Sequence, residues 1–113
     1  MRDRAGARNG DLGQGYRRDM AGSELLDELL RHMADPFPES VVKGEDYGEV
    51  DAVMIGADIY GLASRSDSLN AFDRSRLRQA ANELDRSLQA FPADAKPYYQ
   101  RVLRIARLAL AVS

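Results

Sequence analysis

The sequence predicts an all-α protein, a four-helix bundle preceded by a mobile tail. Apolar residues recur at three- and four-residue spacing in four stretches, which is the period of an amphipathic helix. Alternation of apolar and polar residues is nowhere sustained, so no strand pattern competes. Proline, glycine and short polar segments separate the four stretches. We expect helices at residues 23–34, 47–64, 69–90 and 95–112, joined by short connections.

The composition bounds the size and class of the protein. A chain of 113 residues has room for one hydrophobic core, which we expect within residues 23–113. Cysteine is absent, which excludes disulfides, thiolate metal sites and cysteine nucleophiles. His32 is the only histidine. The formal net charge of −2 argues against a nucleic-acid-binding protein. No apolar run reaches the roughly 18 residues of a membrane helix, so we expect a cytoplasmic protein.

Residues 1–22 differ from the rest of the chain. They hold five of the nine glycines, five arginines and three aspartates, but few large apolar residues. Such a segment cannot bury enough surface to offset its ordering entropy, so we predict a mobile tail. Two alternatives stay open: a basic arm that grips an acidic partner, or an upstream extension, residues 1–19, before a biological start at Met20. No apolar segment of a secretory signal follows the basic residues.

The first predicted helix, residues 23–34, has clear end signals. Ser23 is a favourable N-cap, and the proline that follows Asp35 ends the helix. His32 lies in the last turn, where an imidazolium interacts favourably with the helix dipole, so we assign it a capping role. In the connector that follows, Val41 and Val42 are expected to pack against the core.

The second predicted helix, residues 47–64, is apolar on nearly all sides, which is typical of the central helix of a bundle. Asp46 and Glu49 have the spacing of a capping box at its start. The expected core stripe consists of Val50, Met54, Ala57 and Gly61. Alanines and glycines on another arc predict that a neighbouring helix approaches closely, since glycine inside a helix otherwise costs about 1 kcal/mol.

Two aspartates interrupt this apolar helix. Asp51 and Asp58 are seven residues apart and therefore lie on one side of it, about 10 Å apart. We expect Asp58 to be at least half-buried. In one interpretation Asp51 sits near the helix dipole and Asp58 pairs with an Arg or Tyr of a facing helix. In the other, both line a cleft for a divalent cation or a cationic partner, together with Glu45, Asp46 and Glu49.

The last two helices have simpler patterns. The third is expected to bury a seam of Leu77, Ala81, Leu84, Leu88 and Phe91, backed by Ala80 and Phe72. Asp94 is the expected N-cap of the fourth helix, with Pro97 tolerated in its first turn.

The fourth helix also carries a basic face. Arg101, Arg104 and Arg107 are spaced by three and fan over about 120° of the helix surface. Residues 35–51 carry a net charge of −5, from six acidic residues and one lysine. The arginines either answer these acids across the fold or bind an acidic partner.

The segment from Lys43 to Gly61 is similar to the central motif of a group of short bacterial all-helical proteins with no established activity. The shared string is Gly-Glu-Asp, Gly, Val-Asp, Val-Met, Ala-Asp-Ile and Gly, and the resemblance covers residues 23–112. It implies that the acidic positions to test first are Glu45, Asp46, Asp51 and Asp58.

A looser resemblance is to all-α nucleotide pyrophosphohydrolases, which hold Mg²⁺ with carboxylates at Glu-x-x-Glu and Glu-x-x-Asp spacing. Glu24 and Asp27 match the second spacing, but the acids of residues 45–58 do not.

Three functions fit these patterns. The first, which we favour, is a non-catalytic protein that binds a protein partner through charged patches, as small bacterial immunity or regulatory proteins do. The second is a carboxylate–metal hydrolase that uses Mg²⁺ or Mn²⁺ on a phosphorylated or nucleotide substrate; no other cofactor is expected. The third, compatible with either, is a homo-oligomer in which the second helix completes its burial against a symmetry mate.

Overall fold

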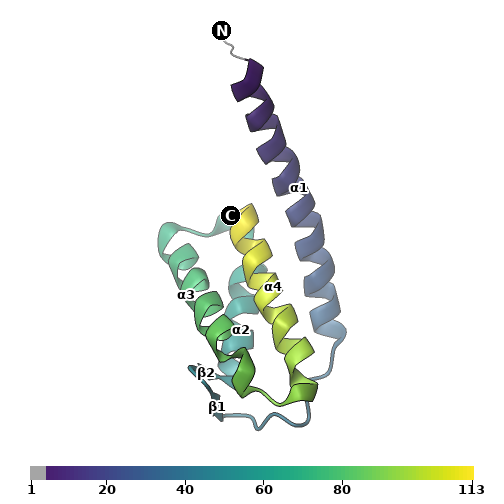
Figure 1. Cartoon of the computed structure of the whole chain (residues 1–113), viewed down its shortest axis with the longest axis vertical. Coiled ribbons are helices and arrows are strands. Elements are labelled where there is room, and N and C mark those ends of the chain that lie inside the picture. Colours follow the sequence, from purple (N-terminus) through teal and green to yellow (C-terminus); the bar gives the residue numbers. More distant parts are fainter. Residues whose placement is uncertain (1–4) are drawn as a thin grey trace.

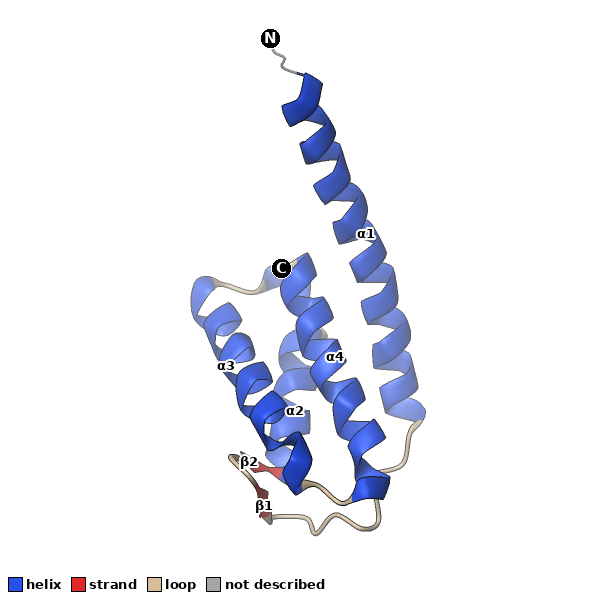
Figure 2. Ribbon diagram, in the orientation of Figure 1, coloured by secondary structure: helices blue, strands red, loops and turns tan. Residues whose placement is uncertain are grey.

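The computed structural model describes the backbone of residues 5–113 and the side chains of residues 20–113. Within this range the chain forms four α-helices and a short β-hairpin (Figures 1 and 2). The predicted four-helix fold class is therefore confirmed. The elements in chain order are α1 (Ala5–Ala34), β1 (Asp46–Tyr47), β2 (Val50–Asp51), α2 (Ala52–Ala63), α3 (Ala71–Ser87) and α4 (Lys96–Val112), with 3-10 turns at Ser66–Ser68, Leu88–Ala90 and Ala93–Ala95.

Helix α1 is longer than predicted. It runs through Ser23, which therefore caps no helix end, because no proline interrupts the preceding residues and most of them are tolerated in helices. Its N-terminal half extends beyond the C-terminal end of α4 (Figure 1). The predicted tail, residues 1–22, falls largely on residues whose side chains lie outside the described part of the chain.

A short hairpin, with two residues in each strand, replaces the predicted first turn of the second helix. Strand β1 pairs antiparallel with β2, with Asp46 opposite Asp51 and Tyr47 opposite Val50. Gly48, at the turn, has a φ of 64°, a conformation that other residues seldom adopt and that ends any helix there. The predicted capping box at Asp46 is wrong, and α2 begins at Ala52 instead.

The central helix is α4, not α2 as predicted. Helix α4 packs against α1, α2 and α3, whereas α1 packs chiefly against α4. Helix α2 buries Ile55, Ile59 and Leu62, the arc that faces α3 and α4. Of the predicted core stripe, Val50 is buried, but in β2 rather than in a helix, whereas Met54, Ala57 and Gly61 are exposed. Helix α2 is therefore apolar on two sides but buried on only one.

Helices α3 and α4 lie close to their predicted positions. The Asn70 side chain caps α3 by accepting a hydrogen bond from the Asp73 amide at 2.7 Å. Asp94 does not cap α4; it lies in the preceding 3-10 turn, and Ala95 occupies the N-cap position. Phe72 is 70% exposed rather than part of the core, because it lies in the first turn of α3 on the side away from the other helices.

The core surrounds Tyr99 of α4. This side chain is fully buried, and its hydroxyl donates a hydrogen bond of 2.7 Å to the carbonyl oxygen of Ala52, which ties α4 to the start of α2. In the connector, Val41 is buried as predicted and Val42 is exposed. None of the described helices is long and apolar enough to cross a membrane.

Candidate functional site

Two of the acidic candidates near the hairpin, Asp51 and Glu49, are used to hold the fold. Asp51 Oδ1 accepts hydrogen bonds from the amides of Val53 at 2.9 Å and Met54 at 2.8 Å. It is therefore the N-cap of α2, in agreement with the interpretation that places it near the helix dipole. Glu45 and Asp46 are exposed on the approach to this cap.

Glu49 clamps the hairpin to the end of α3. Its carboxylate accepts two hydrogen bonds of 2.7 Å from Arg86, and these bonds hold the pKa of Glu49 below its usual value. The Glu49 amide also donates to the hydroxyl of Ser87 at 2.9 Å, and Ser87 donates to the carbonyl of Glu83 at 2.7 Å. Glu49 is thus committed to an ion pair within the chain.

Asp58 is exposed, which contradicts the expected half-burial. It lies on the α3 side of α2, at a shallow hollow shared with Arg76 and Glu83. The expectation failed because α2 turns its Ile55 and Ile59 arc to the core and thereby carries Asp58 to the edge of the buried face.

The structure does not bring the five acidic candidates together. Four of them lie on or beside the hairpin and Asp58 lies two turns along α2, facing α3. Among the described side chains, no group of three or more Asp, Glu or His residues is arranged to hold a metal ion.

The predicted basic face is paired within the chain. Arg104 of α4 donates to Glu24 at 2.6 Å and to Glu28 at 2.8 Å, both on α1. Arg101 pairs with Asp35 and approaches Glu28, and the third arginine, Arg107, lies 3.1 Å from Asp85 of α3. These arginines therefore join α4 to its neighbours: two of the four paired acids belong to α1, one to α3, and Asp35 belongs to the acidic segment of residues 35–51.

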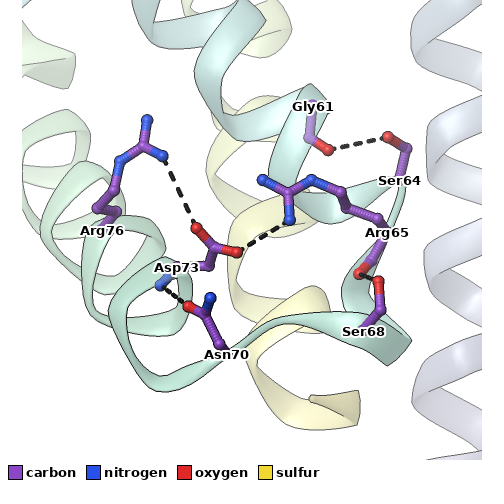
Figure 3. A network of polar contacts seen from close by, with 7 residues as sticks. All are labelled: Gly61, Ser64, Arg65, Ser68, Asn70, Asp73 and Arg76. Carbon is purple, nitrogen blue, oxygen red and sulfur yellow. Dashed lines mark hydrogen bonds and ion pairs between the residues drawn. The ribbon is translucent and has the colours of Figure 1, made fainter.

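A second polar network closes the turn between α2 and α3 (Figure 3). Asp73 accepts a hydrogen bond of 2.9 Å from Arg65 and lies 3.8 Å from Arg76. The hydroxyls of Ser64 and Ser68 donate to carbonyl oxygens within the same turn. The network satisfies polar groups at two helix ends.

A mainly apolar groove lies elsewhere, between α1 and α2. This groove has a volume of about 460 Å³. It runs along one side of α2 and reaches α1 at its last turn. Its lining carries no carboxylate, lysine or arginine and consists of His32, Met33, Phe37, Ala52, Val53, Gly56, Ala57, Tyr60, Gly61 and Tyr98.

The glycines of α2 face empty space in this groove. A Cβ atom placed on Gly56 or on Gly61 would meet no other atom within 4 Å. On the arc of small residues that predicted a close helix approach, Ala52 and Ala63 are buried against the rest of the bundle, but no described part of the chain packs on Gly56. Small side chains nevertheless leave the α2 backbone accessible from the groove.

An aromatic cluster lines the end of the groove at α1. The His32 ring centroid lies 4.9 Å from that of Tyr98 and 5.7 Å from that of Tyr60. Burial, with a contribution from the charge of Arg101, lowers the pKa of His32, so the neutral imidazole is favoured. The predicted capping role of a charged His32 is therefore not supported, and its Nδ1 atom is buried without a hydrogen-bond partner among described residues.

Large apolar side chains stand exposed on both sides of the groove. On α1, Leu26, Leu30 and Met33 are 58%, 57% and 70% exposed and follow one another at helical spacing, forming what we call the α1 ridge. On α2, Val53 and Met54 are 40% and 56% exposed. Contiguous exposed apolar surface of this kind marks interaction sites in other proteins.

Sequence reasoning came near this surface only in the homo-oligomer hypothesis, in which the second helix completes its burial against a symmetry mate, and it did not expect an exposed apolar face on the first helix. The signal was present in the first helix, where Leu25 and Leu29 lie on one arc and the α1 ridge on another. A helix at the edge of a bundle buries only one such arc. We now regard the α1–α2 groove and the α1 ridge as the candidate site.

Comparisons with protein-family models, curated proteins and solved structures gave no match for this chain.

Proposed function

We propose that this chain is a non-catalytic, cytoplasmic protein-binding module that uses the α1–α2 groove and the α1 ridge. The observation that carries this proposal is the open side of the bundle. There, five large apolar side chains are at least 40% exposed on two helices that flank one groove, Leu26, Leu30, Met33, Val53 and Met54. Exposing them to water is unfavourable, and a partner that covers them would gain by their burial.

We assign the binding surface to this apolar face rather than to the charged patches suggested by the sequence. The predicted basic face is engaged with acids of α1 and α3, and Glu49 with Arg86. Exposed ion pairs of this kind contribute little to stability, but a partner would have to break them to reach the charges. A partner can bind in the groove without breaking an ion pair.

A protein suits the groove better than a small substrate. The groove is open along α2, and the exposed ridge continues beyond it along α1. Sites for small molecules enclose most of the ligand, whereas protein interfaces combine shallow grooves with protruding apolar side chains. Regulatory and immunity-like proteins, the class we favour, act by such contacts.

Site-specific photo-crosslinking tests the proposal. We would replace Met54, beside the groove, by p-benzoylphenylalanine in the full chain and irradiate cells that express it. Phe72 is the matched control position, since its side chain is 70% exposed but lies in the first turn of α3. We expect discrete adducts from position 54 and few from position 72. Equal labelling at the two positions, or none at position 54, would contradict the proposed surface.

A further inference from the structure

We infer that the groove receives a second copy of this chain, in a two-fold dimer where the α1 ridge of each copy enters the α1–α2 groove of the other. This inference rests on the proposed function, because it uses the same surface, and it names the partner. Four observations support it: the open bundle, the shape of α2, the self-complementary face and its size.

The bundle lacks one of its four sides. In a closed four-helix bundle each helix packs against two neighbours around a shared core. Here α4 packs against all three other helices, and α1 packs chiefly against α4, so the side between α1 and α2 stays open. A helix seated in that opening would contact both α1 and α2.

Helix α2 is shaped to receive a helix. Gly56, Ala57 and Gly61 line the groove, and nothing lies within 4 Å of a Cβ placed on either glycine. Side chains of a docking helix could therefore pack directly against the α2 backbone. Contacts made there would offset the cost of about 1 kcal/mol that each glycine imposes on a helix.

The chain itself supplies a fitting occupant. Leu26, Leu30 and Met33 form a ridge one helical arc wide, and its last member, Met33, also lines the groove. A two-fold interface requires one surface to hold both complementary parts, because each contact occurs twice. The α1 ridge and the α1–α2 groove satisfy that requirement.

The charge distribution favours a second copy over a charged partner. None of the side chains that form the ridge or line the groove is an acid, a lysine or an arginine, and the pKa of His32 is lowered. A face without charges does not repel its own copy, whereas two acidic or basic faces would. It also offers a charged partner no electrostatic attraction.

The exposed apolar side chains supply more than half of the area that a dimer interface needs. Together the five present roughly 500 Å² of surface, in the range of the largest patches on monomers. In the dimer the walls of the groove would supply the rest of the ~800 Å² per partner that a stable interface buries.

Sedimentation equilibrium of the full chain, from about 10 µM to about 500 µM, tests the inference. We expect a mass of about twice 12.5 kDa for the unmodified chain. Leu30→Lys on the ridge and Gly61→Lys in the groove should each give the monomer mass. Lysine is a good helix former, so neither change should disrupt its helix, and far-UV circular dichroism would verify this. Phe72→Lys, at an equally exposed apolar position on α3, should leave the dimer unchanged.

The outcomes separate this inference from the proposed function. A monomeric unmodified chain at every concentration would overturn the inference, as would an assembly larger than two copies. A dimer that survives Leu30→Lys and Gly61→Lys, or that is lost with Phe72→Lys, would overturn the assigned interface. If the chain is monomeric but position 54 still crosslinks to a different protein, the proposed function stands and only the second copy is excluded.

Discussion

Substitution of Gly48 by alanine should destabilise the protein strongly, because this residue combines a left-handed backbone with a close contact. Its φ is 64°, and an alanine there costs about 1–2 kcal/mol. The added Cβ would lie 2.7 Å from the Ser87 hydroxyl oxygen and 3.1 Å from the Ser87 Cα. The second atom belongs to the backbone of α3, so a side-chain rotation cannot relieve the overlap.

Relief requires the hairpin to move away from α3. That movement would break the hydrogen bond from the Glu49 amide to the buried Ser87 hydroxyl, at a cost of about 1–3 kcal/mol. The expected total loss for Gly48→Ala is thus about 2–5 kcal/mol. Gly44 is the matched control: its φ is 89°, but a Cβ there would meet nothing within 4 Å. Gly44→Ala should therefore lose only the backbone part, about 1–2 kcal/mol.

Urea denaturation followed by circular dichroism measures both losses as free energies of unfolding. A double variant, Gly48→Ala with Ser87→Gly, removes the atoms that the new methyl group would meet first, so its loss should be smaller than the sum of the two single losses. Equal losses for Gly48→Ala and Gly44→Ala would refute the reasoning, because they would show that contact with α3 adds nothing.

Three further predictions concern the candidate residues. Asp51→Ala should lower the free energy of unfolding by about 1 kcal/mol through loss of the α2 cap, whereas Asp58→Asn should change it by less than about 0.5 kcal/mol; equal effects in urea denaturation would contradict this. Because folding lowers the pKa of His32, the unfolded chain takes up a proton first, and stability should fall as the pH drops below 6.5. The NMR resonances of the only imidazole, His32, should titrate with a midpoint below pH 6.5, and a midpoint above it would contradict the assigned burial. Millimolar Mg²⁺, Mn²⁺ or Ca²⁺ should leave the thermal midpoint unchanged, and a rise would favour the carboxylate–metal alternative.

The sequence predicted the helices that rest on long apolar periods. The region of α3 and α4 lies within a few residues of its predicted position, because Leu77, Leu84, Val102 and Ile105 mark one buried arc on each helix. The hairpin was missed because each strand has only two residues, too few for a pattern of alternation. Gly44 and Gly48 are local signals for turns, but the close approach of Gly48 to Ser87 of α3, which is distant in sequence, is not visible in the local residues.

The candidate site was harder to predict than the fold. Periodicity shows which residues share an arc, but it does not show which arc faces the core when a helix has two apolar arcs. In α2 the branched side chains of Ile55 and Ile59 fill the interior, and Met54 and Ala57 are left outside. With the Ile55 and Ile59 arc turned to the core, Asp58 lies at the edge of the buried face of α2, and the predicted acidic cleft does not form.

Because α2 turns only one of its two apolar arcs to the core, the second arc lies on the open side of the bundle, where we place the binding surface. A helix that needs only one buried arc gains nothing from glycines and exposed apolar residues on a second arc, since each glycine costs about 1 kcal/mol and each exposed apolar side chain forgoes its burial. Gly56, Gly61 and Met54 impose these costs on α2 within the single chain. A helix docked on that arc, as we propose, would offset them. The second apolar arc of α2 and the second apolar arc of α1 border the same groove, so one docking helix would satisfy both.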